Sequence, residues 1–219
     1  MNRLEVFKSF RVYAVTSLRC EDDWQLRDIE SAYRGGADIV QLRSKTLSDA
    51  VLFRLGLQVR KIADRFGKLY FVNDRLDLAL GTGADGLHVG QDDLPVSVIR
   101  NLFARAGREL LIGKSTHSYE QAVATAEENV DYIGVGPIFE TPTKPDYKAV
   151  GLSVIQRVTL DVDIPIVAIG GIDETNLKQV LDAGARRVAV VRGIFGQKDV
   201  ENAVRKIREC VTSYEMACV

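Results

Sequence analysis

Two cations and an amide stand at alternate positions in the segment QLRSK. In a β-strand, Gln41, Arg43 and Lys45 would therefore lie on the same side. Guanidinium, ammonium and amide groups that converge at a strand end are suited to binding a phosphate or diphosphate. Taken singly, Arg43 or Lys45 is more typical of a solvated strand end, so the phosphate interpretation depends on the neighbouring motifs.

Two carboxylates lie 19 residues apart, Asp74 in FVNDR and Asp93 in GQDD, and Asn73 directly precedes the first. This spacing is one strand–helix unit, so both aspartates are expected at the ends of neighbouring strands. Facing carboxylates repel unless a cation lies between them. Mg²⁺ held by one or two carboxylates, waters and substrate phosphates fits this arrangement. The alternative is that Asp74 caps the helix at LDLAL and Asp93 the helix at Pro95.

Hydroxyl and imidazole groups occur in IGKSTHS and GLHVG. Ser115 could donate to a phosphate oxygen, whereas Ser118 is typical of a helix N-cap. His88 and His117 are the two histidines of the chain, and neither belongs to an HxH or HExxH motif, so a transition-metal site is not expected. We expect His88 to be a polar residue that lines the interior, and the role of His117 stays open.

A long segment, PIFETPTKPDYKAVG, covers residues 137–151 and holds three of the five prolines. Long, proline-stiffened loops in compact domains are usually functional. Thr141, Thr143 and Lys144 offer two hydroxyls and a cation, so the segment is predicted to close over an anionic ligand. A simple surface excursion is the alternative.

A repeating unit must position these residues. Helical segments that end in small residues are followed by continuous Val/Ile/Leu runs, which are typical of parallel strands buried on both faces. The predicted strands are 11–17, 35–43, 68–73, 81–90, 109–115, 128–136, 164–170 and 183–191. Predicted helices are 23–34, 48–66 with Ser48 as N-cap, LDLAL, 96–106, 118–128, 152–160, 174–183 and 199–213.

Strict alternation of strands and helices predicts parallel strands joined by right-handed crossovers. Asp38, Asp85 and Asp131 recur at similar junctions, 47 and 46 residues apart, which is about two units each. Eight such units predict an α/β fold, a (βα)8 TIM barrel, with a doubly wound open sheet as the alternative. We expect one domain over 1–219, with 1–10 as an N-terminal extension and 212–219 as a frayed tail.

Glycines follow the last two predicted strands, Gly171 in IGGI and Gly193 after Val191 and Arg192. Glycine lets backbone N–H groups approach a ligand closely, and (βα)8 barrels often bind phosphate at this place. The sequence thus predicts two separate anion sites and a metal. Two phosphorylated substrates, one with a diphosphate leaving group, would use both sites.

Composition limits the other classes of partner. The chain has 219 residues, 46% of them hydrophobic, and 29 basic against 30 acidic residues, so no basic excess favours nucleic acid. Apolar stretches such as PIVAIGGI are far shorter than the roughly 18 residues of a membrane span. Cys20, Cys210 and Cys218 form no CxxC motif, which together with the charged first twenty residues predicts a cytoplasmic protein. A homo-oligomer is compatible with the sequence, which leaves the oligomeric state open.

The chain resembles the thiamine phosphate synthase family from residue 11 to residue 210. The resemblance lies in the ordered segments QLRSK, FVNDRLDLAL, ADGLHVGQDDLP, IGKSTHS, GVGPIFETPTKPDYKAVGL, IPIVAIGGI and AVVRGIF. It implies a (βα)8 barrel that joins 4-amino-2-methyl-5-hydroxymethylpyrimidine diphosphate to 4-methyl-5-(2-phosphoethyl)thiazole, giving thiamine phosphate and diphosphate. The implied mechanism is dissociative and needs no nucleophile–base pair, and the sequence shows none.

The resemblance also implies residue roles. Asp74 and Asp93 would bind Mg²⁺. The residues expected to bind the pyrimidine diphosphate are Gln41, Leu42, Arg43, Ser44, Lys45, Asn73, Ser115 and Lys144. Those expected to bind the thiazole phosphate are Thr141, Pro142, Thr143, Gly171, Val191 and Arg192. Among them the predicted catalytic residues are Arg43, Lys45, Ser115 and Lys144.

One residue departs from the family pattern, because many relatives carry Ser where this chain has Arg192. A guanidinium there could grip the thiazole phosphate directly, or point away and leave the backbone to bind it. Two other functions compete with the synthase. The thiazole tautomerase branch tends to lose the GQDD carboxylate and the TxTK loop, and a non-catalytic binding barrel has little use for a diphosphate site.

Overall fold

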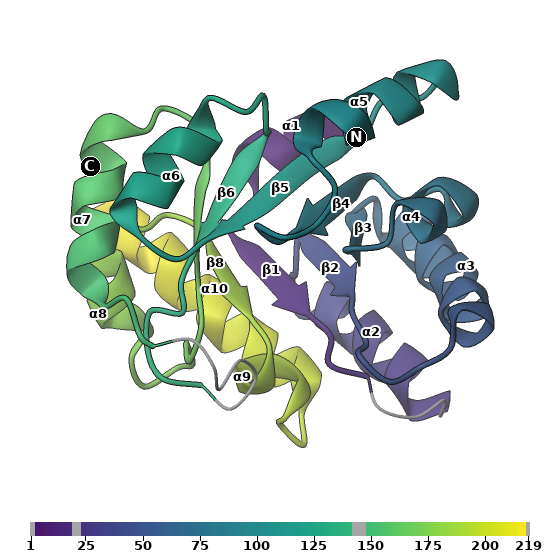
Figure 1. Cartoon of the computed structure of the whole chain (residues 1–219). Helices are drawn as coiled ribbons and strands as arrows, with labels where there is room; N and C mark the ends of the chain where they lie inside the picture. Colours follow the sequence, from purple (N-terminus) through teal and green to yellow (C-terminus); the bar gives the residue numbers. More distant parts are fainter. Residues whose placement is uncertain (1–2, 19–22, 142–147, 218–219) are drawn as a thin grey trace.

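A computed structural model describes residues 3–18, 23–141 and 148–217. Its eight parallel strands close into a barrel in the order β1-β2-β3-β4-β5-β6-β7-β8, and the helices surround it (Figure 1). The strands are β1 (Val12–Val15), β2 (Ile39–Leu42), β3 (Leu69–Asn73), β4 (Gly86–Val89), β5 (Leu111–Thr116), β6 (Tyr132–Val135), β7 (Ile166–Ile169) and β8 (Val188–Val190).

The helices alternate with the strands, except that α1 precedes β1 and two helices, α9 and α10, follow β8. They are α1 (Arg3–Ser9), α2 (Asp23–Arg34), α3 (Asp49–Phe66), α4 (Leu76–Thr82), α5 (Val96–Arg105), α6 (Tyr119–Ala126), α7 (Leu152–Asp161), α8 (Leu177–Asp182), α9 (Arg192–Phe195) and α10 (Val200–Ala217). The predicted (βα)8 barrel is confirmed, and the open sheet is excluded by the pairing of β1 with β8.

Two predicted N-caps have different outcomes. Ser118 accepts a hydrogen bond from the Gln121 N–H at 3.1 Å, as an N-cap should. Ser48 occupies the N-cap position of α3 in an extended conformation, but its side chain makes no capping hydrogen bond. At the other end of α3, Gly67 adopts φ 63° and its N–H donates to the carbonyls of Ala63 and Asp64, so a glycine C-cap that was not predicted from the sequence is present there.

Alternate residues of each strand face different cores, as the strand period of two requires. In β1, Val12 and Ala14 pack outward against the helices, whereas Tyr13 and Val15 fill the barrel interior. In β3, Tyr70 and Val72 face outward in the same way. Both faces are therefore buried, which explains why the strands are continuous apolar runs.

The amino-terminal end of the barrel, here called the base, is closed by α1. Val6 and Phe7 of α1, together with Phe10, pack under the interior rings of Tyr13 and Tyr132. In Figure 1, α1 lies at the opposite end of the barrel from α9. The ligand-accessible end must therefore be the other one, where the strands end and α9 begins.

Three buried or half-buried aspartates join neighbouring strands at the base. The carboxylates of Asp38, Asp85 and Asp131 accept hydrogen bonds from the N–H groups of Val12, Tyr70 and Ile112 at 3.2, 2.8 and 2.6 Å. The N–H of each aspartate donates in turn to the carbonyl of the same partner. The recurrence of these aspartates in the sequence is thus a repeated strand junction.

The ends of the described chain are helical. α1 occupies most of the predicted extension 1–10, and α10 continues to Ala217 through the segment 212–217; whether that tail frays stays a prediction. Within the described residues, no helix is long and apolar enough to cross a membrane.

Candidate active site

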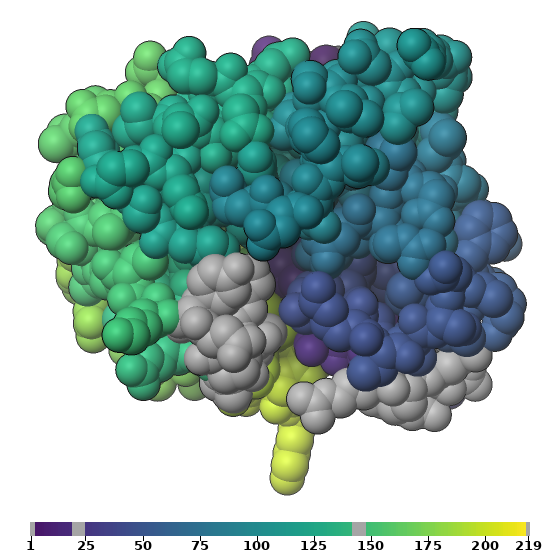
Figure 2. All heavy atoms as spheres, viewed as in Figure 1, coloured from purple at the N-terminus to yellow at the C-terminus, as the bar shows by residue number. Residues whose placement is uncertain are grey.

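A cavity of about 260 Å³ opens at the mouth of the barrel, where the strands end. All eight strands contribute to its lining, through Tyr13, Val15, Gln41, Asn73, His88, Ser115, Tyr132, Gly134, Val167, Ile169 and Ala189. In the space-filling view the surface is hollowed between the blue and teal segments (Figure 2). Residues that are far apart in the sequence therefore meet around one space.

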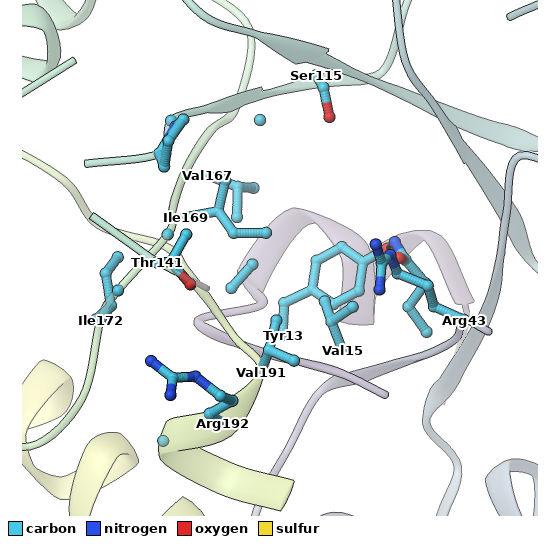
Figure 3. A pocket seen from close by; sticks show the side chains of 18 of the residues that line it. Tyr13, Val15, Arg43, Ser115, Thr141, Val167, Ile169, Ile172, Val191 and Arg192 are labelled. Atoms are coloured by element: carbon cyan, nitrogen blue, oxygen red, sulfur yellow. Dashed lines mark hydrogen bonds between the residues drawn. The ribbon is translucent and has the colours of Figure 1, made fainter. Parts of the chain in front are cut away.

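The cationic cluster after β2 is only partly directed into the cavity. Gln41 is buried and lines it, and Arg43 lines it from one side (Figure 3). Thr16 fixes the backbone of Arg43, because its hydroxyl accepts from the Arg43 N–H at 2.8 Å and donates to the Arg43 carbonyl at 3.1 Å. Burial lowers the pKa of the Arg43 guanidinium, and the charge of Asp74 offsets part of this effect.

Two further residues of QLRSK have other surroundings. The Leu42 side chain is buried in the core between sheet and helices and does not line the cavity. The Ser44 hydroxyl donates to the Leu18 carbonyl at 2.7 Å and accepts from the N–H of Leu47 at 3.0 Å. Ser44 therefore stabilises the loop that carries the neighbouring cations. Whether either residue binds substrate stays a prediction.

Asp74 and Asp93 are brought into contact beside a lysine. Burial raises the pKa of Asp74, the charge of Asp93 and a hydrogen bond with it raise the pKa further, and Lys45 partly offsets the shift. The Lys45 Nζ lies 3.3 Å from Asp74 Oδ2, while Asp93 Oδ2 accepts from the Gly90 N–H at 2.6 Å. Asp74 adopts φ 59°, a left-handed conformation that aspartate tolerates better than most residues.

This pair fits a hard divalent cation. Two carboxylates in contact disfavour ionisation of both, and a cation between them relieves that repulsion. Among the described residues no cluster of three or more metal-binding side chains occurs, so the protein would supply two ligands and leave the others to phosphate and water, as is usual for Mg²⁺. Neither aspartate is a helix N-cap: Arg75 and Pro95 occupy those positions in α4 and α5.

Ser115 and His88 meet at the floor of the cavity. His88 Nε2 lies 2.8 Å from Ser115 Oγ, and His88 Nδ1 lies 2.8 Å from the Tyr132 hydroxyl. The prediction that His88 lines the interior as a polar residue is confirmed. The sequence shows no nucleophile–base pair. The structure, however, brings a serine and a histidine within hydrogen-bond distance.

A second group of predicted residues lies across the cavity from Arg43. Thr141, Gly171, Val191 and Arg192 line this side, and in Figure 3 the Arg192 side chain lies near Thr141, on the opposite side of the pocket from Arg43. Arg192 is exposed at the start of α9. Pro142, Thr143 and Lys144 lie outside the described residues.

The turn after β7 that carries Gly171 is held in place by its neighbours. Gly171 adopts φ 67°, and a Cβ there would lie 2.7 Å from the Phe139 Cβ, so only glycine fits. Asn176 Nδ2 donates to the Gly171 carbonyl at 2.8 Å, and the Phe139 N–H donates to the carbonyl of Gly170 at 3.0 Å. The loops after β6 and β7 are therefore joined at this side of the mouth.

Several lining residues were not predicted as site residues. Tyr13 and Tyr132 lie on predicted strands, but an apolar run that is buried on both faces gives no sign of which residues point inward. His117 also lines the cavity, and its Nδ1 lies 2.5 Å from the Gly136 carbonyl. The position of His117 directly after β5 could have identified it as a site residue, since ligands bind at strand ends in barrels.

Comparison with known proteins gives a consistent family. The sequence model of the family described as thiamine monophosphate synthase matches residues 12–194. A thiamine-phosphate synthase of Thermus thermophilus is 44% identical over 204 residues, which cover 91% of this chain and 96% of that protein. One of Ruminiclostridium cellulolyticum is 39% identical and covers 91% and 94% of the two chains.

The relatives also differ from this chain in length, and some of them have solved structures. This chain spans only 57% of the thiamine-phosphate synthase of Thermosynechococcus vestitus, to which it is 40% identical. The solved thiamine phosphate pyrophosphorylase of Pyrococcus furiosus superposes with a TM-score of 0.85 at 31% identity, covering 94% of this chain and 96% of that one. A 3-hexulose-6-phosphate synthase, at 16% identity and a TM-score of 0.64, shows the shared fold alone.

Proposed function

The chain belongs to the thiamine monophosphate synthase family, and from this premise we propose that it joins 4-amino-2-methyl-5-hydroxymethylpyrimidine diphosphate to 4-methyl-5-(2-phosphoethyl)thiazole. The products are thiamine phosphate and diphosphate. One observation carries the proposal: a single cavity has a guanidinium on one side, at Arg43, and a glycine turn with a second guanidinium on the other, at Gly171 and Arg192. Two phosphorylated substrates can thus face each other between two anion-binding sides.

The bond changes are those of a substitution at carbon. The C–O bond between the pyrimidine methylene and the diphosphate breaks, and its electron pair leaves with the diphosphate. The thiazole nitrogen then forms the new C–N bond to the methylene carbon. Arg43 and Lys45 stabilise the charge that develops on the diphosphate, and Ser115 donates a hydrogen bond to it.

Orientation accounts for the rest of the acceleration. The anion side at Gly171 and Arg192 fixes the thiazole phosphate, which holds the ring nitrogen opposite the methylene carbon as a near-attack arrangement requires. Lys144, with Pro142 and Thr143, is proposed to close over the ligands, as the sequence predicts. Bound by Asp74 and Asp93, Mg²⁺ would supply neutralisation of the diphosphate charge. We also place the reaction in the cytoplasm, since the sequence contains no CxxC motif.

A coupling assay tests the proposal. The purified protein is mixed with both substrates, with and without Mg²⁺, and thiamine phosphate is read after oxidation to fluorescent thiochrome. Product that appears only with the metal is the expected result. Conversion of the thiazole tautomer without coupling would move the chain to the tautomerase branch, and binding of the thiazole phosphate without either reaction would leave a ligand-binding barrel.

A further inference from the structure

A continuous chain of hydrogen bonds crosses the floor of the cavity and joins five strands. It begins at Gln41 in β2, whose Nε2 donates to the Tyr13 hydroxyl at 2.7 Å. The Tyr13 hydroxyl lies 3.1 Å from that of Tyr132. The chain then continues through His88 to Ser115, with two contacts of 2.8 Å. We call these five residues the floor relay.

The amide at the start gives the relay a direction. An amide nitrogen can only donate, so the Tyr13 oxygen accepts from Gln41 and its own proton is directed to Tyr132. Burial raises the pKa of Tyr13 and that of Tyr132, so both phenols keep their protons at neutral pH. Tyr132 already accepts from Tyr13, and its proton is therefore directed to His88 Nδ1.

The last two links follow from the same count of protons. With Nδ1 accepting from Tyr132, the ring proton lies on Nε2, which donates to Ser115 Oγ 2.8 Å away. The Ser115 hydroxyl then accepts from His88, which leaves its own proton for a ligand in the cavity. If the hydrogen bond ran the other way, Ser115 would donate to an unprotonated Nε2. The histidine would then act as a base toward the serine, as in an activated nucleophile.

We propose that Tyr132 and His88 are positioning residues that fix Ser115 as a hydrogen-bond donor to the substrate and prevent it from acting as a nucleophile. The inference deepens the proposed function, since the substrate group that accepts from Ser115 is the departing diphosphate. A hydroxyl whose proton is already oriented needs no reorganisation when charge develops on the leaving group.

The surrounding strands are built to hold the relay. A Cβ at Gly113 in β5 would lie 2.0 Å from Cζ of Tyr132, and a Cβ at Gly134 in β6 would lie 3.2 Å from Cε1 of His88. The two glycines thus leave the space that the rings occupy. The rings of His88 and Tyr132 stack with centroids 5.5 Å apart, so the orientation of the imidazole is set by packing as well as by hydrogen bonds.

The tautomer of His88 is a direct readout. The chain has only two histidines, so ¹⁵N-histidine labelling gives two rings, and the variant His117→Gln assigns them. The wild-type protein without substrate is expected to show a pyridine-like Nδ1 and a pyrrole-like Nε2 for His88. A protonated Nδ1 with a bare Nε2, or a doubly protonated ring, would overturn the proposal.

Tyr132→Phe then cuts the relay while keeping the ring that fills the space over Gly113. We expect a mixture of the two His88 tautomers and a fall in kcat of roughly tenfold, as for a donor that is no longer aligned. The KM for the thiazole phosphate should change by less than about twofold, because that substrate lies on the other side of the cavity.

Tyr33→Phe is the matched control, because Tyr33 is an equally buried tyrosine whose hydroxyl donates to the Leu69 carbonyl at 2.8 Å in the helix layer. It should leave the His88 tautomer and kcat at wild-type values. An unchanged tautomer in Tyr132→Phe, or the same loss of kcat in both variants, would overturn the relay. The tautomer of the wild-type ring is measured without turnover, so failure of the synthase assay and failure of the relay are separate results.

Discussion

The two ends of the barrel use the same charged groups in opposite ways. At the base, Asp85 is almost completely buried and lies 2.6 Å from Arg60 and 2.9 Å from Arg3, and it also accepts from the Tyr70 N–H. At the mouth, Asp74 lies against Asp93, with Lys45 3.3 Å away as a largely exposed partner.

This difference separates stability from ligand binding. At the base, a buried carboxylate that is paired with two arginines and a backbone N–H stabilises the strand junction. At the mouth, a carboxylate beside another carboxylate is stabilised by a further cation. Arg43 shows the same contrast with Arg60. Burial lowers the pKa of Arg43, whereas for Arg60 the charge of Asp85, a hydrogen bond with it and the charge of Asp64 together outweigh burial and raise the pKa. Incomplete pairing at the mouth leaves charge for the proposed substrates and the proposed metal.

The largest effect is expected from Asp93→Asn at the mouth. Turnover should fall by roughly 100-fold or more, because the change removes one of the two proposed Mg²⁺ ligands. The melting temperature should move by less than about 3 °C, since an asparagine oxygen can still accept from the Gly90 N–H. Asp92→Asn, at the exposed neighbouring position, is the control and should retain activity. Parallel loss of turnover and melting temperature would give Asp93 a structural role instead.

Asp85→Asn should produce the reverse result at the base. Removing the charge leaves the half-buried Arg60 without its main partner, and the free energy of unfolding should fall by about 3 kcal/mol. Urea denaturation measures this, and kcat of the folded fraction should stay at the wild-type value. Asp64→Asn removes an exposed partner of the same arginine and should cost less than about 1 kcal/mol. Equal costs in the two variants would contradict the contrast between the ends.

Arg192→Ser tests the second anion side with a smaller change. If the guanidinium binds the thiazole phosphate directly, the KM of the variant for this substrate should rise roughly tenfold, which corresponds to about 1.4 kcal/mol. Stability should not change, because Arg192 is exposed. Lys198→Ser, another exposed cation nearby in the chain, is the control. A KM at the wild-type value would show that the backbone of the turns binds the phosphate alone.

The smallest effect is an acid dependence of the base. Burial alone would raise the pKa of Asp38, but Lys68, the Arg11 N–H and Arg208 outweigh it and lower the pKa below its ordinary value of 3.8. The stabilisation by Asp38 is therefore present above about pH 4 and is lost as the pH falls through the lowered pKa. Compared with the wild type, Asp38→Asn should show a shallower loss of stability below pH 4, by at most about 1.4 kcal/mol per pH unit. Identical slopes in urea denaturation would contradict this.

The fold could be predicted because each local sequence pattern fits one type of secondary structure. The runs around Val40, Val72 and Ile133 are apolar on both faces, and they alternate with helical stripes, which closed barrels require. Ser48 shows the limit of such rules: it occupies the predicted N-cap position, yet its hydroxyl makes no capping bond. A preference of the residue type does not determine the rotamer in a particular loop.

The site could be predicted where chemistry follows a strand end in the sequence. Asp74 and Asp93 are found because both occur at such ends and one unit apart, and the structure brings them into contact. Leu42 shows the opposite case, since its neighbours line the cavity whereas its own side chain is in the outer core. The period of two in a strand already separates it from Gln41 and Arg43.

The sequence by itself determined the alternation of strands and helices, the family, and the charged residues at the mouth, because these depend on residue types at short spacings. Only the tertiary structure decided that Tyr13, Tyr132 and His88, from three different strands, form one hydrogen-bonded floor. Closure of the barrel fixes which residues point inward and which lie at the same height, and this depends on the register between strands. No local pattern carries that register, because both faces of every strand are buried.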